Sequence, residues 1–327
     1  MTREVVLKAH PHGEPQESDF ELHEAPDAAP GDGEVLVRNV FVSVDPYMRG
    51  RMTGVRTYVG PYELGGPIDG GTVGRVVESR HDGFAEGDWV LSQLGWREQG
   101  IAAGAGLRKL DASLAPPSTA LGVLGMPGLT AWVGLVDIGV VKEGETIYVS
   151  GAAGAVGSTA VQIAKLKGLR VIGSAGSAEK VDWLRSLGVE AFNYRETPAK
   201  EALGDGIDVF FDNVGGEQLE AALNALRPFG RVIACGAISR YNDARLEPGP
   251  RNLGFVVSKR LRLQGFIVSD HFDRFPAFLA EVGPWVAAGE LQYRETVLDG
   301  IESVPAAFAG LFRGDNTGKM LVRVGPD

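Results

Sequence analysis

Gly151, Gly154 and Gly157 stand between a β-branched run and a stretch with helical periodicity. The segment 146–167 reads TIYVSGAAGAVGSTAVQIAKLK. Glycines at this spacing let a chain turn tightly from a strand into a helix and approach an anionic group closely. The first backbone amides of such a helix bind the diphosphate of a dinucleotide. The pattern therefore predicts a dinucleotide site. The residues expected to contact the cofactor there are Gly151, Gly154, Ala155, Val156 and Gly157.

The end of the next predicted strand indicates which dinucleotide binds. NAD-binding folds place an acidic residue about 20 positions after the glycines, where it holds the ribose 2′-hydroxyl. Here the strand ends in VIGSAGSAEK, and we expect Ser174 and Ser177 in the turn with Lys180 behind them. Hydroxyls and an ammonium group stabilise a 2′-phosphate, so the sequence favours NADPH over NADH. Tyr194 and Arg195 could flank the same phosphate, whereas Lys180 could equally be a solvated helix residue.

The 327 residues show two different patterns of apolar residues, one before and one after about residue 120. Up to about residue 120, short alternating runs and glycine turns predict a β-rich domain. From about residue 121, apolar runs alternate with helix patterns, one of them over 216–230, which predicts a doubly wound parallel sheet. The tail is expected to return to the first domain as a helix and a strand. We therefore expect an α/β protein whose first domain spans 1–120, completed by 289–327, and whose second spans 121–288.

Composition excludes several classes of partner. With a net charge of −10, the chain lacks the clustered positive charge that nucleic acids or anionic membranes require. No apolar run reaches the length of a membrane span and the N-terminal segment lacks the apolar core of a signal peptide, so we expect a cytoplasmic protein. The single cysteine, Cys235, excludes an internal disulfide. Of the histidines, only His10 and His12 are closely spaced, so no metal site is predicted.

Nearly the whole chain resembles the medium-chain dehydrogenase/reductase superfamily. The similar segments include VSVDPYMRGRM (42–52), GMPGLTAW (125–132), FDNVGGE (211–217) and GDNTGKM (314–320). VDPYMR and FDNVGG together are the most specific of these. They are most similar to the zinc-independent branch of prostaglandin reductases, leukotriene dehydrogenases, plant alkenal double-bond reductases and bacterial curcumin-reductase-like enzymes. The resemblance implies a GroES-like catalytic domain built from both chain ends, a Rossmann domain between them, and NADPH in the cleft.

The resemblance also implies roles for single residues. Lys180 and Tyr194 match the residues that relatives place at the 2′-phosphate. Asn213 in FDNVGG and Asn316 in GDNTGK match residues near the nicotinamide. Where zinc-dependent relatives carry a cysteine and a Gly-His-Glu element, this chain has VSVDPYM and IDGGTVG, so no metal is expected. Relatives are often homodimers, and we expect one here.

The reaction implied is reduction of the carbon–carbon double bond of an α,β-unsaturated ketone or aldehyde, the expected small-molecule partner. Hydride reaches the β-carbon, negative charge gathers on the carbonyl oxygen, and the α-carbon is then protonated. A protonated tyrosine can donate to that oxygen in place of a metal. The candidates are Tyr241 in AISRYN and Tyr47 in VDPYMR, although Tyr47 could instead pack its ring in the core. The segment 54–68, which contains Tyr58 and Tyr62, either lines an apolar substrate mouth or folds on its own aromatic rings.

Two other functions are compatible with the same scaffold. A quinone reductase or short-alcohol dehydrogenase would share the cofactor site, and a quinone reductase would tolerate loss of both tyrosines. A catalytically silent NADPH-binding protein would have broken cofactor or donor positions. Both sets of residues are present in this chain, which favours an active enzyme.

Overall fold

The chain divides into two compact units. The computed structural model describes residues 1–204, 206–245 and 248–326. Unit 1 comprises 1–122 and 295–327, and unit 2 comprises 123–294. Both chain ends therefore belong to unit 1, and the glycine turn belongs to unit 2.

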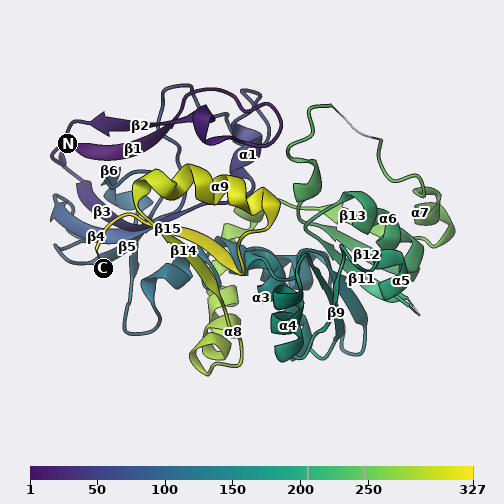
Figure 1. Ribbon diagram of the computed structural model, residues 1–327. Helices are drawn as coiled ribbons and strands as arrows, with labels where there is room; N and C mark the ends of the chain where they lie inside the picture. Colours follow the sequence, from purple (N-terminus) through teal and green to yellow (C-terminus); the bar gives the residue numbers. More distant parts are fainter. Residues whose placement is uncertain (205, 246–247, 327) are drawn as a thin grey trace. The chain divides into compact units, whose positions relative to one another are not determined.

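Unit 2 is built on a six-stranded parallel sheet with the order β10-β9-β8-β11-β12-β13 (Figure 1). The strands are β8 (Thr146–Val149), β9 (Arg170–Ala175), β10 (Glu190–Asn193), β11 (Ile207–Asp212), β12 (Leu226–Ala234) and β13 (Arg262–Gly265). From β8 the chain moves outward to β9 and β10, then returns to place β11 on the other side of β8. In doubly wound folds, ligands bind at the carboxyl ends of the strands beside such a reversal. The predicted doubly wound sheet is confirmed.

Helices pack on both faces of this sheet. They are α2 (Met126–Val133), α3 (Ala155–Leu166), α4 (Ala178–Ser186), α5 (Ala199–Ala202), α6 (Gly216–Ala225), α7 (Gly254–Ser258) and α8 (Phe275–Ala287). Successive residues of a strand face opposite sides. Ile147 of β8 lies in one buried cluster with Leu129 of α2 and Ile163 of α3. Tyr148 lies in the other cluster, with Leu223 of α6. Cores on both faces thus fix the strand ends that carry the candidate site.

One predicted helix ends earlier than expected. The pattern predicts a helix over 216–230, but α6 ends at Ala225 and β12 begins at Leu226. Pro228 explains the difference, because proline lacks the amide proton that a helix needs and disfavours helical backbone at the residue before it. The prediction beyond Ala225 is therefore wrong, and 226–230 starts a strand.

Unit 1 contains a seven-stranded mixed sheet with the order β14-β15-β3-β4-β5-β7 and with β6 beside β3, while β1 and β2 form a separate antiparallel pair. The strands are β1 (Thr2–Leu7), β2 (Phe20–Ala25), β3 (Glu34–Ser43), β4 (Thr72–Ser79), β5 (Trp89–Ser92), β6 (Gln99–Ala103), β7 (Arg108–Leu110), β14 (Glu295–Asp299) and β15 (Lys319–Arg323). Its α-helices are α1 (Met48–Arg51) and α9 (Val304–Arg313). The predicted β-rich domain is confirmed.

The C-terminal tail contributes one strand more than predicted. It supplies β14 and β15 on either side of α9, where the sequence pattern predicts one helix and one strand. The run ETVLD of β14 has only two strongly apolar residues, too few to predict a strand. Phe308 of α9 packs against Phe20 and Trp96, with ring centroids 6.2 and 5.5 Å away. The tail therefore completes the core of the N-terminal strands.

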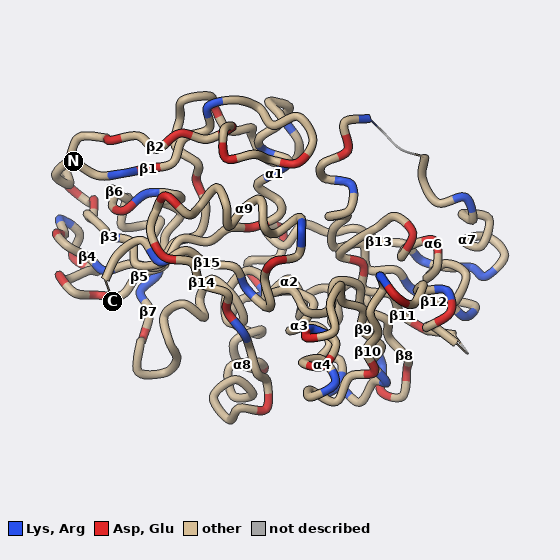
Figure 2. Tube along the Cα trace, in the orientation of Figure 1, with Lys and Arg blue, Asp and Glu red and all other residues tan. Residues whose placement is uncertain are grey.

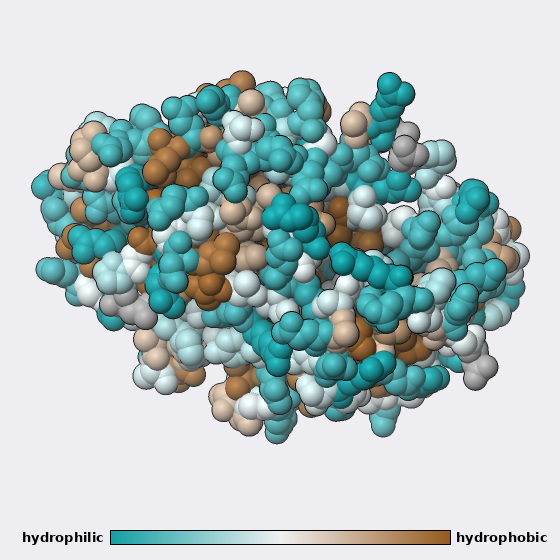
Figure 3. All heavy atoms as spheres, in the orientation of Figure 1, coloured by the Kyte–Doolittle hydropathy of each residue, from teal (hydrophilic) through white to brown (hydrophobic). Residues whose placement is uncertain are grey.

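Charge is dispersed over both units. Lys and Arg are interspersed with Asp and Glu along the trace (Figure 2). The face drawn in Figure 3 is mostly hydrophilic, with separate apolar patches. Within the described part of the chain, no helix has the length and apolar character needed to cross a membrane.

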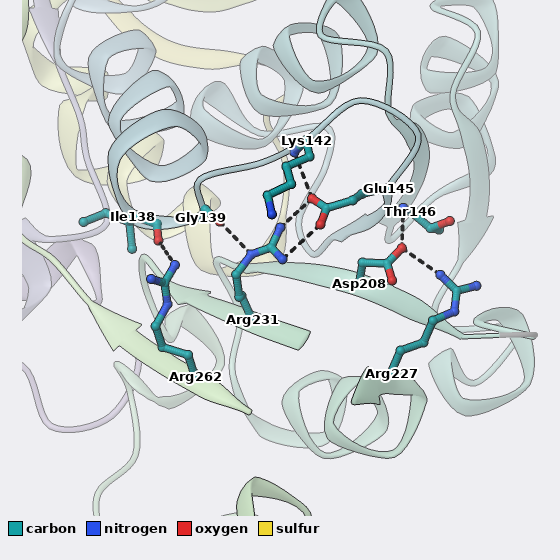
Figure 4. A network of polar contacts seen from close by, with 9 residues as sticks. All are labelled: Ile138, Gly139, Lys142, Glu145, Thr146, Asp208, Arg227, Arg231 and Arg262. Atoms are coloured by element: carbon teal, nitrogen blue, oxygen red, sulfur yellow. Dashed lines mark hydrogen bonds and ion pairs between the residues drawn. The ribbon is translucent and has the colours of Figure 1, made fainter. Parts of the chain in front are cut away.

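Ion pairs tie the amino ends of the strands in unit 2 together (Figure 4). Arg231 of β12 makes a fork with Glu145, with N–O distances of 3.0 and 2.5 Å, and its Nε donates to the Gly139 carbonyl at 2.7 Å. Asp208 of β11 accepts a hydrogen bond from Arg227 at 2.7 Å. In a parallel sheet the amino ends lie opposite the carboxyl ends, so this network stabilises the sheet away from the glycine turn.

Candidate active and cofactor sites

The glycine turn follows β8 and starts α3. Gly151 has a φ of +58°, in the left-handed region that favours glycine. Gly154 is the N-cap of α3, so the helix starts without a capping side chain and its first amides suit an anion. A Cβ on Gly157 would lie 2.2 Å from the Gly151 carbonyl oxygen, so only glycine lets α3 pass this close beneath the turn. Gly154, Ala155 and Val156 are half-buried. The geometry fits a dinucleotide diphosphate.

A group of polar and aromatic side chains forms at the carboxyl ends of β9 and β10. Ser177 is the N-cap of α4, and its hydroxyl accepts a hydrogen bond from the Lys180 amide at 3.4 Å. Tyr194 covers Gly176, since a Cβ there would lie 2.9 Å from the tyrosine hydroxyl oxygen. The Arg195 guanidinium lies 5.9 Å from the centre of the Tyr194 ring. Four of the residues expected around a 2′-phosphate are therefore neighbours in the fold.

Ser174 does not lie in the turn where the sequence places it. It belongs to β9 and is fully buried. Its hydroxyl donates to Gln218 Oε1 at 2.8 Å and lies 2.9 Å from the Tyr148 hydroxyl oxygen, which also bonds Gln218 at 2.6 Å. The expected turn position is wrong because the strand continues through Ala175 before the chain turns. The Ser174 hydroxyl therefore bonds within the sheet core.

Asn213 lies directly after β11, next to the glycine turn. Its Nδ2 donates to the Ser150 carbonyl at 2.8 Å, and its backbone amide donates to Ser150 Oγ at 2.9 Å. Ser150 Oγ in turn donates to the buried Asp212 carboxylate at 3.1 Å. Ser150 and Asp212 are not among the residues predicted from sequence. Their positions at strand ends, next to Gly151 and Asn213, are the signal that could have identified them.

Tyr241 follows the short helix η5 (Ile238–Arg240) on the loop after β12. The chain folds back there, so that the Ala237 amide donates to the Tyr241 hydroxyl at 3.4 Å. The hydroxyl oxygen would lie 3.1 Å from a Cβ on Gly236. Tyr241 thus places its hydroxyl at the carboxyl end of β12, in the same unit as Asn213.

Tyr47 belongs to unit 1, at the start of α1. Its ring packs on the core cluster that contains Met48, Met52 and Tyr62, so the alternative of a core-packed ring is supported. Burial, with a further contribution from the Asp45 carboxylate, raises the pKa of the Tyr47 hydroxyl well above its usual value. The hydroxyl therefore keeps its proton at neutral pH and can act as a donor.

An ion pair in unit 1 joins the chain just before Tyr47 to the chain just after Asn316. Lys319 Nζ lies 3.1 Å from Asp45 Oδ1, and both side chains are buried. The ammonium also donates to the Val44 carbonyl at 2.9 Å. Asn316 Nδ2 donates to the Gly318 carbonyl at 2.7 Å. Tyr47 and Asn316 are therefore held on neighbouring segments of the same unit.

The segment 54–68 divides between the two interpretations offered for it. Tyr62 is buried, its hydroxyl donates to the Asp69 carbonyl at 2.7 Å, and the Arg51 guanidinium lies 3.8 Å from its ring centre. Tyr58 and Leu64 are exposed. Tyr62 thus belongs to the core, and only the exposed side chains remain as candidates to contact a substrate.

Metal ligation can be assessed over the residues that the structure describes. No group of three or more His, Cys, Asp and Glu side chains among them could hold a metal ion. Of the closely spaced histidines, His10 places its Nδ1 2.9 Å from the Met52 carbonyl.

Known proteins similar to this chain share its whole length. A family described as the N-terminal domain of oxidoreductase matches residues 3–110, and one described as zinc-binding dehydrogenase matches residues 155–283. The NADPH-dependent curcumin reductase of Escherichia coli is 46% identical, over 99% of this chain and 97% of that protein. The NADP(+)-dependent 2-alkenal reductase of Nicotiana tabacum is 42% identical, over 98% of this chain and 97% of that protein.

A solved structure agrees with these relatives. The crystal structure of CurA from Vibrio vulnificus in complex with NADPH superposes with a TM-score of 0.94 at 40% identity, covering 99% of this chain and all of that one. The fold and both matched regions define an oxidoreductase of the dehydrogenase/reductase type. The chain belongs to the medium-chain dehydrogenase/reductase superfamily and, within it, to the branch that contains the curcumin, alkenal and prostaglandin reductases.

Proposed function

We propose that this protein is an NADPH-dependent reductase of the carbon–carbon double bond of α,β-unsaturated ketones and aldehydes. One observation carries the proposal: the glycine turn, Lys180, Tyr194 and Asn213 follow the carboxyl ends of four neighbouring strands, β8, β9, β10 and β11 respectively. This is the edge at which doubly wound sheets bind dinucleotides. The names of the curcumin and alkenal reductases support the same chemistry.

We propose that the residues at these strand ends each bind a different part of the cofactor. The first amides of α3, after Gly154, would hold the diphosphate. Lys180 and Tyr194 would hold the 2′-phosphate, and Asn213 would hold the nicotinamide end. Asn316, which belongs to unit 1, is proposed as a nicotinamide contact on the family resemblance alone. When bound, NADPH supplies the hydride for the β-carbon. Ser174 is left out of this set because its hydroxyl bonds inside the sheet.

Tyrosine hydroxyls are the proposed donors to the carbonyl oxygen. Negative charge develops on that oxygen as the double bond is reduced, so a donor aimed at it stabilises the transition state. Tyr47 remains protonated because burial raises its pKa. Tyr241 lies on a half-buried loop at the end of β12. Either hydroxyl can donate a hydrogen bond to the carbonyl oxygen and so stabilise the charge that a metal ion would otherwise stabilise.

A panel of acceptors tests the proposal. Purified protein is mixed with NADPH and with enones, alkenals, quinones or simple ketones, and the nicotinamide absorbance is followed. We expect oxidation with enones and alkenals, and a loss of about 100-fold in turnover when the essential donor is removed by Tyr241→Phe or Tyr47→Phe. Activity with quinones alone, or tight NADPH binding without turnover, would contradict the proposal. Near-full turnover in both variants would remove the tyrosines from it.

We also infer a homodimer that forms through β13. All four residues of this edge strand are exposed, and in the described part of the chain β13 pairs with β12 alone. Unpaired edge strands readily add a strand from another chain, and a twofold pairing of β13 with itself closes the assembly. Val257 and Leu253, on and before α7, add exposed apolar surface.

Light scattering tests the dimer with a matched pair of variants. Leu263 in β13 and Leu166 in α3 are both 39% exposed. We expect Leu263→Asp to lower the measured mass from that of two chains to that of one, and Leu166→Asp to leave it unchanged. A wild-type mass of one chain would contradict the dimer.

We place the protein in the cytoplasm. Its single cysteine, which lies half-buried after β12, suits a reducing compartment. Cell fractionation with antibody detection tests this, and recovery outside the cytoplasmic fraction would contradict it.

A further inference from the structure

We propose that Asp212 and Ser150 form a positioning pair, which fixes the carboxyl ends of β8, β11 and β12 and thereby orients Asn213 and the loop of Tyr241. The inference rests on the proposed function, because it gives the pair a purpose at the nicotinamide end of the cofactor. Neither residue is expected to touch the substrate.

Asp212 receives hydrogen bonds from the turn that follows it. It is the last residue of β11 and is 3% exposed. Its Oδ1 accepts from the Val214 amide at 3.0 Å and from the Gly215 amide at 2.8 Å. Gly215 has a φ of +72°, so the turn takes a conformation that depends on these bonds and on glycine. The carboxylate therefore shapes the segment that carries Asn213.

Ser150 connects this turn to β8. Its hydroxyl donates to Asp212 Oδ1 at 3.1 Å and accepts from the Asn213 amide at 2.9 Å. Its carbonyl accepts from Asn213 Nδ2 at 2.8 Å. The Asn213 carboxamide is thus held by its nitrogen, which leaves its oxygen as the atom that can accept a hydrogen bond from a ligand.

The same residues connect the turn to β12 and the Tyr241 loop. The Asp212 carbonyl accepts from the Cys235 and Gly236 amides at 2.9 and 3.0 Å. The Val214 carbonyl accepts from Ser239 Oγ at 2.6 Å. Tyr241 packs its hydroxyl over Gly236, so a shift of the Asp212 backbone would move this hydroxyl as well.

The buried carboxyl of Asp212 depends on its hydrogen-bond donors. Burial raises the pKa of the Asp212 carboxyl, and the hydrogen bonds from Gly215, Val214 and Ser150 offset only part of that rise. A buried carboxylate without these donors would destabilise the folded protein. The charged form of Asp212 therefore favours the turn conformation that supplies the donors. Replacing Asp212 by Asn keeps an acceptor oxygen but removes the charge that strengthens the bonds.

Binding of two ligands distinguishes a positioning role of Asp212 and Ser150 from a general loss of structure in the variants. NADPH reaches both ends of the site, whereas 2′,5′-ADP carries the 2′-phosphate end without a nicotinamide. We expect Asp212→Asn and Ser150→Ala to raise the dissociation constant of NADPH by about 10-fold and to leave that of 2′,5′-ADP within about twofold, as measured by calorimetry. The double variant should lose less than the product of the single effects, because a direct hydrogen bond joins the two residues and their effects are therefore coupled.

Asp208→Asn is the matched control. Asp208 lies on the same strand as Asp212, but at its amino end, where it bonds Arg227. Its ratio of NADPH to 2′,5′-ADP affinity should equal that of the wild type. In steady-state assays the Asp212 and Ser150 variants should lower kcat as well as the affinity for NADPH. Equal weakening of both ligands in the Asp212 and Ser150 variants, or unchanged NADPH binding in both, would overturn the inference. Failure of the wild type to reduce any enone would instead contradict the proposed function.

Discussion

At the scale of single residues, the difference between Ser174 and Ser177 shows what decides a contact to a phosphate. Both hydroxyls are near the end of β9 in sequence. Ser174 is inside the strand and bonds Tyr148 and Gln218, whereas Ser177 caps α4 in the turn. A difference of three positions therefore changes a candidate ligand into a core residue.

Lys180 makes a direct test at this scale. We expect Lys180→Glu to raise the KM for NADPH at least about 10-fold more than the KM for NADH, because a carboxylate would repel the 2′-phosphate and a charge-assisted bond would be lost. Steady-state kinetics with both cofactors measure this. Lys200→Glu, at an exposed position of α5, is the control and should change neither value. Unchanged selectivity in the Lys180 variant would remove it from the phosphate site.

At the scale of elements, the approach of α3 to the turn after β8 sets the cofactor site. Gly157 lies against the Gly151 carbonyl, whereas Gly154 at the N-cap has room for a side-chain carbon. The glycine spacing alone does not separate these roles, since both positions carry the same residue type. Packing of the helix against the turn separates them.

Two alanine substitutions test this difference. At position 157 the added Cβ would lie 2.2 Å from a backbone oxygen, but at position 154 the closest atom would be 3.4 Å away. We expect Gly157→Ala to lower the free energy of unfolding by about 1–3 kcal/mol, as overpacking does, and Gly154→Ala to have little effect. Chemical denaturation measures both. Equal stability of the two variants would show that the turn is looser than described.

The ion pairs of Figure 4 lie at the amino ends of the strands and allow a second test on elements. The side chains of Arg231 and Glu145 are 16% and 18% exposed, whereas those of the comparable pair Arg170 and Glu190 are 53% and 57% exposed. We expect Arg231→Met to cost about 3 kcal/mol, because it leaves the mostly buried Glu145 carboxylate without its cationic partner. Arg170→Met should cost less than about 1 kcal/mol. Similar losses in both variants would contradict this assignment.

At the scale of the whole molecule, the alternation of apolar runs and helix patterns was enough to predict the parallel sheet and the β-rich unit. Strand periodicity and glycine turns are local signals, so they survive in the sequence. The limits were set by contacts between distant segments. Pro228 ends α6 early, β14 is weakly apolar, and the bonds that join Ser150 to Asp212 span 62 positions. Side-chain pairs of this kind appear only after the strands are placed side by side.

For the site residues too, local signals could be predicted from sequence and long-range contacts could not. Ser177, Lys180 and Tyr194 could be predicted to lie together because each follows a strand or starts a helix at the same edge of the sheet. Asp212 and Ser150 could not be assigned a partner from their spacing. The tyrosine candidates belong to different units, and their proposed shared role rests on the resemblance of VDPYMR and AISRYN to the family.

The most direct test of the account is the position of isotope in the product. The protein is supplied with an aryl enone and with NADPH that carries deuterium at the transferable position, and the product is examined by NMR. We predict a saturated ketone with deuterium on the β-carbon, and a solvent-derived hydrogen on the α-carbon. Deuterium on the carbonyl carbon of an unsaturated alcohol, or an unchanged enone, would contradict the account.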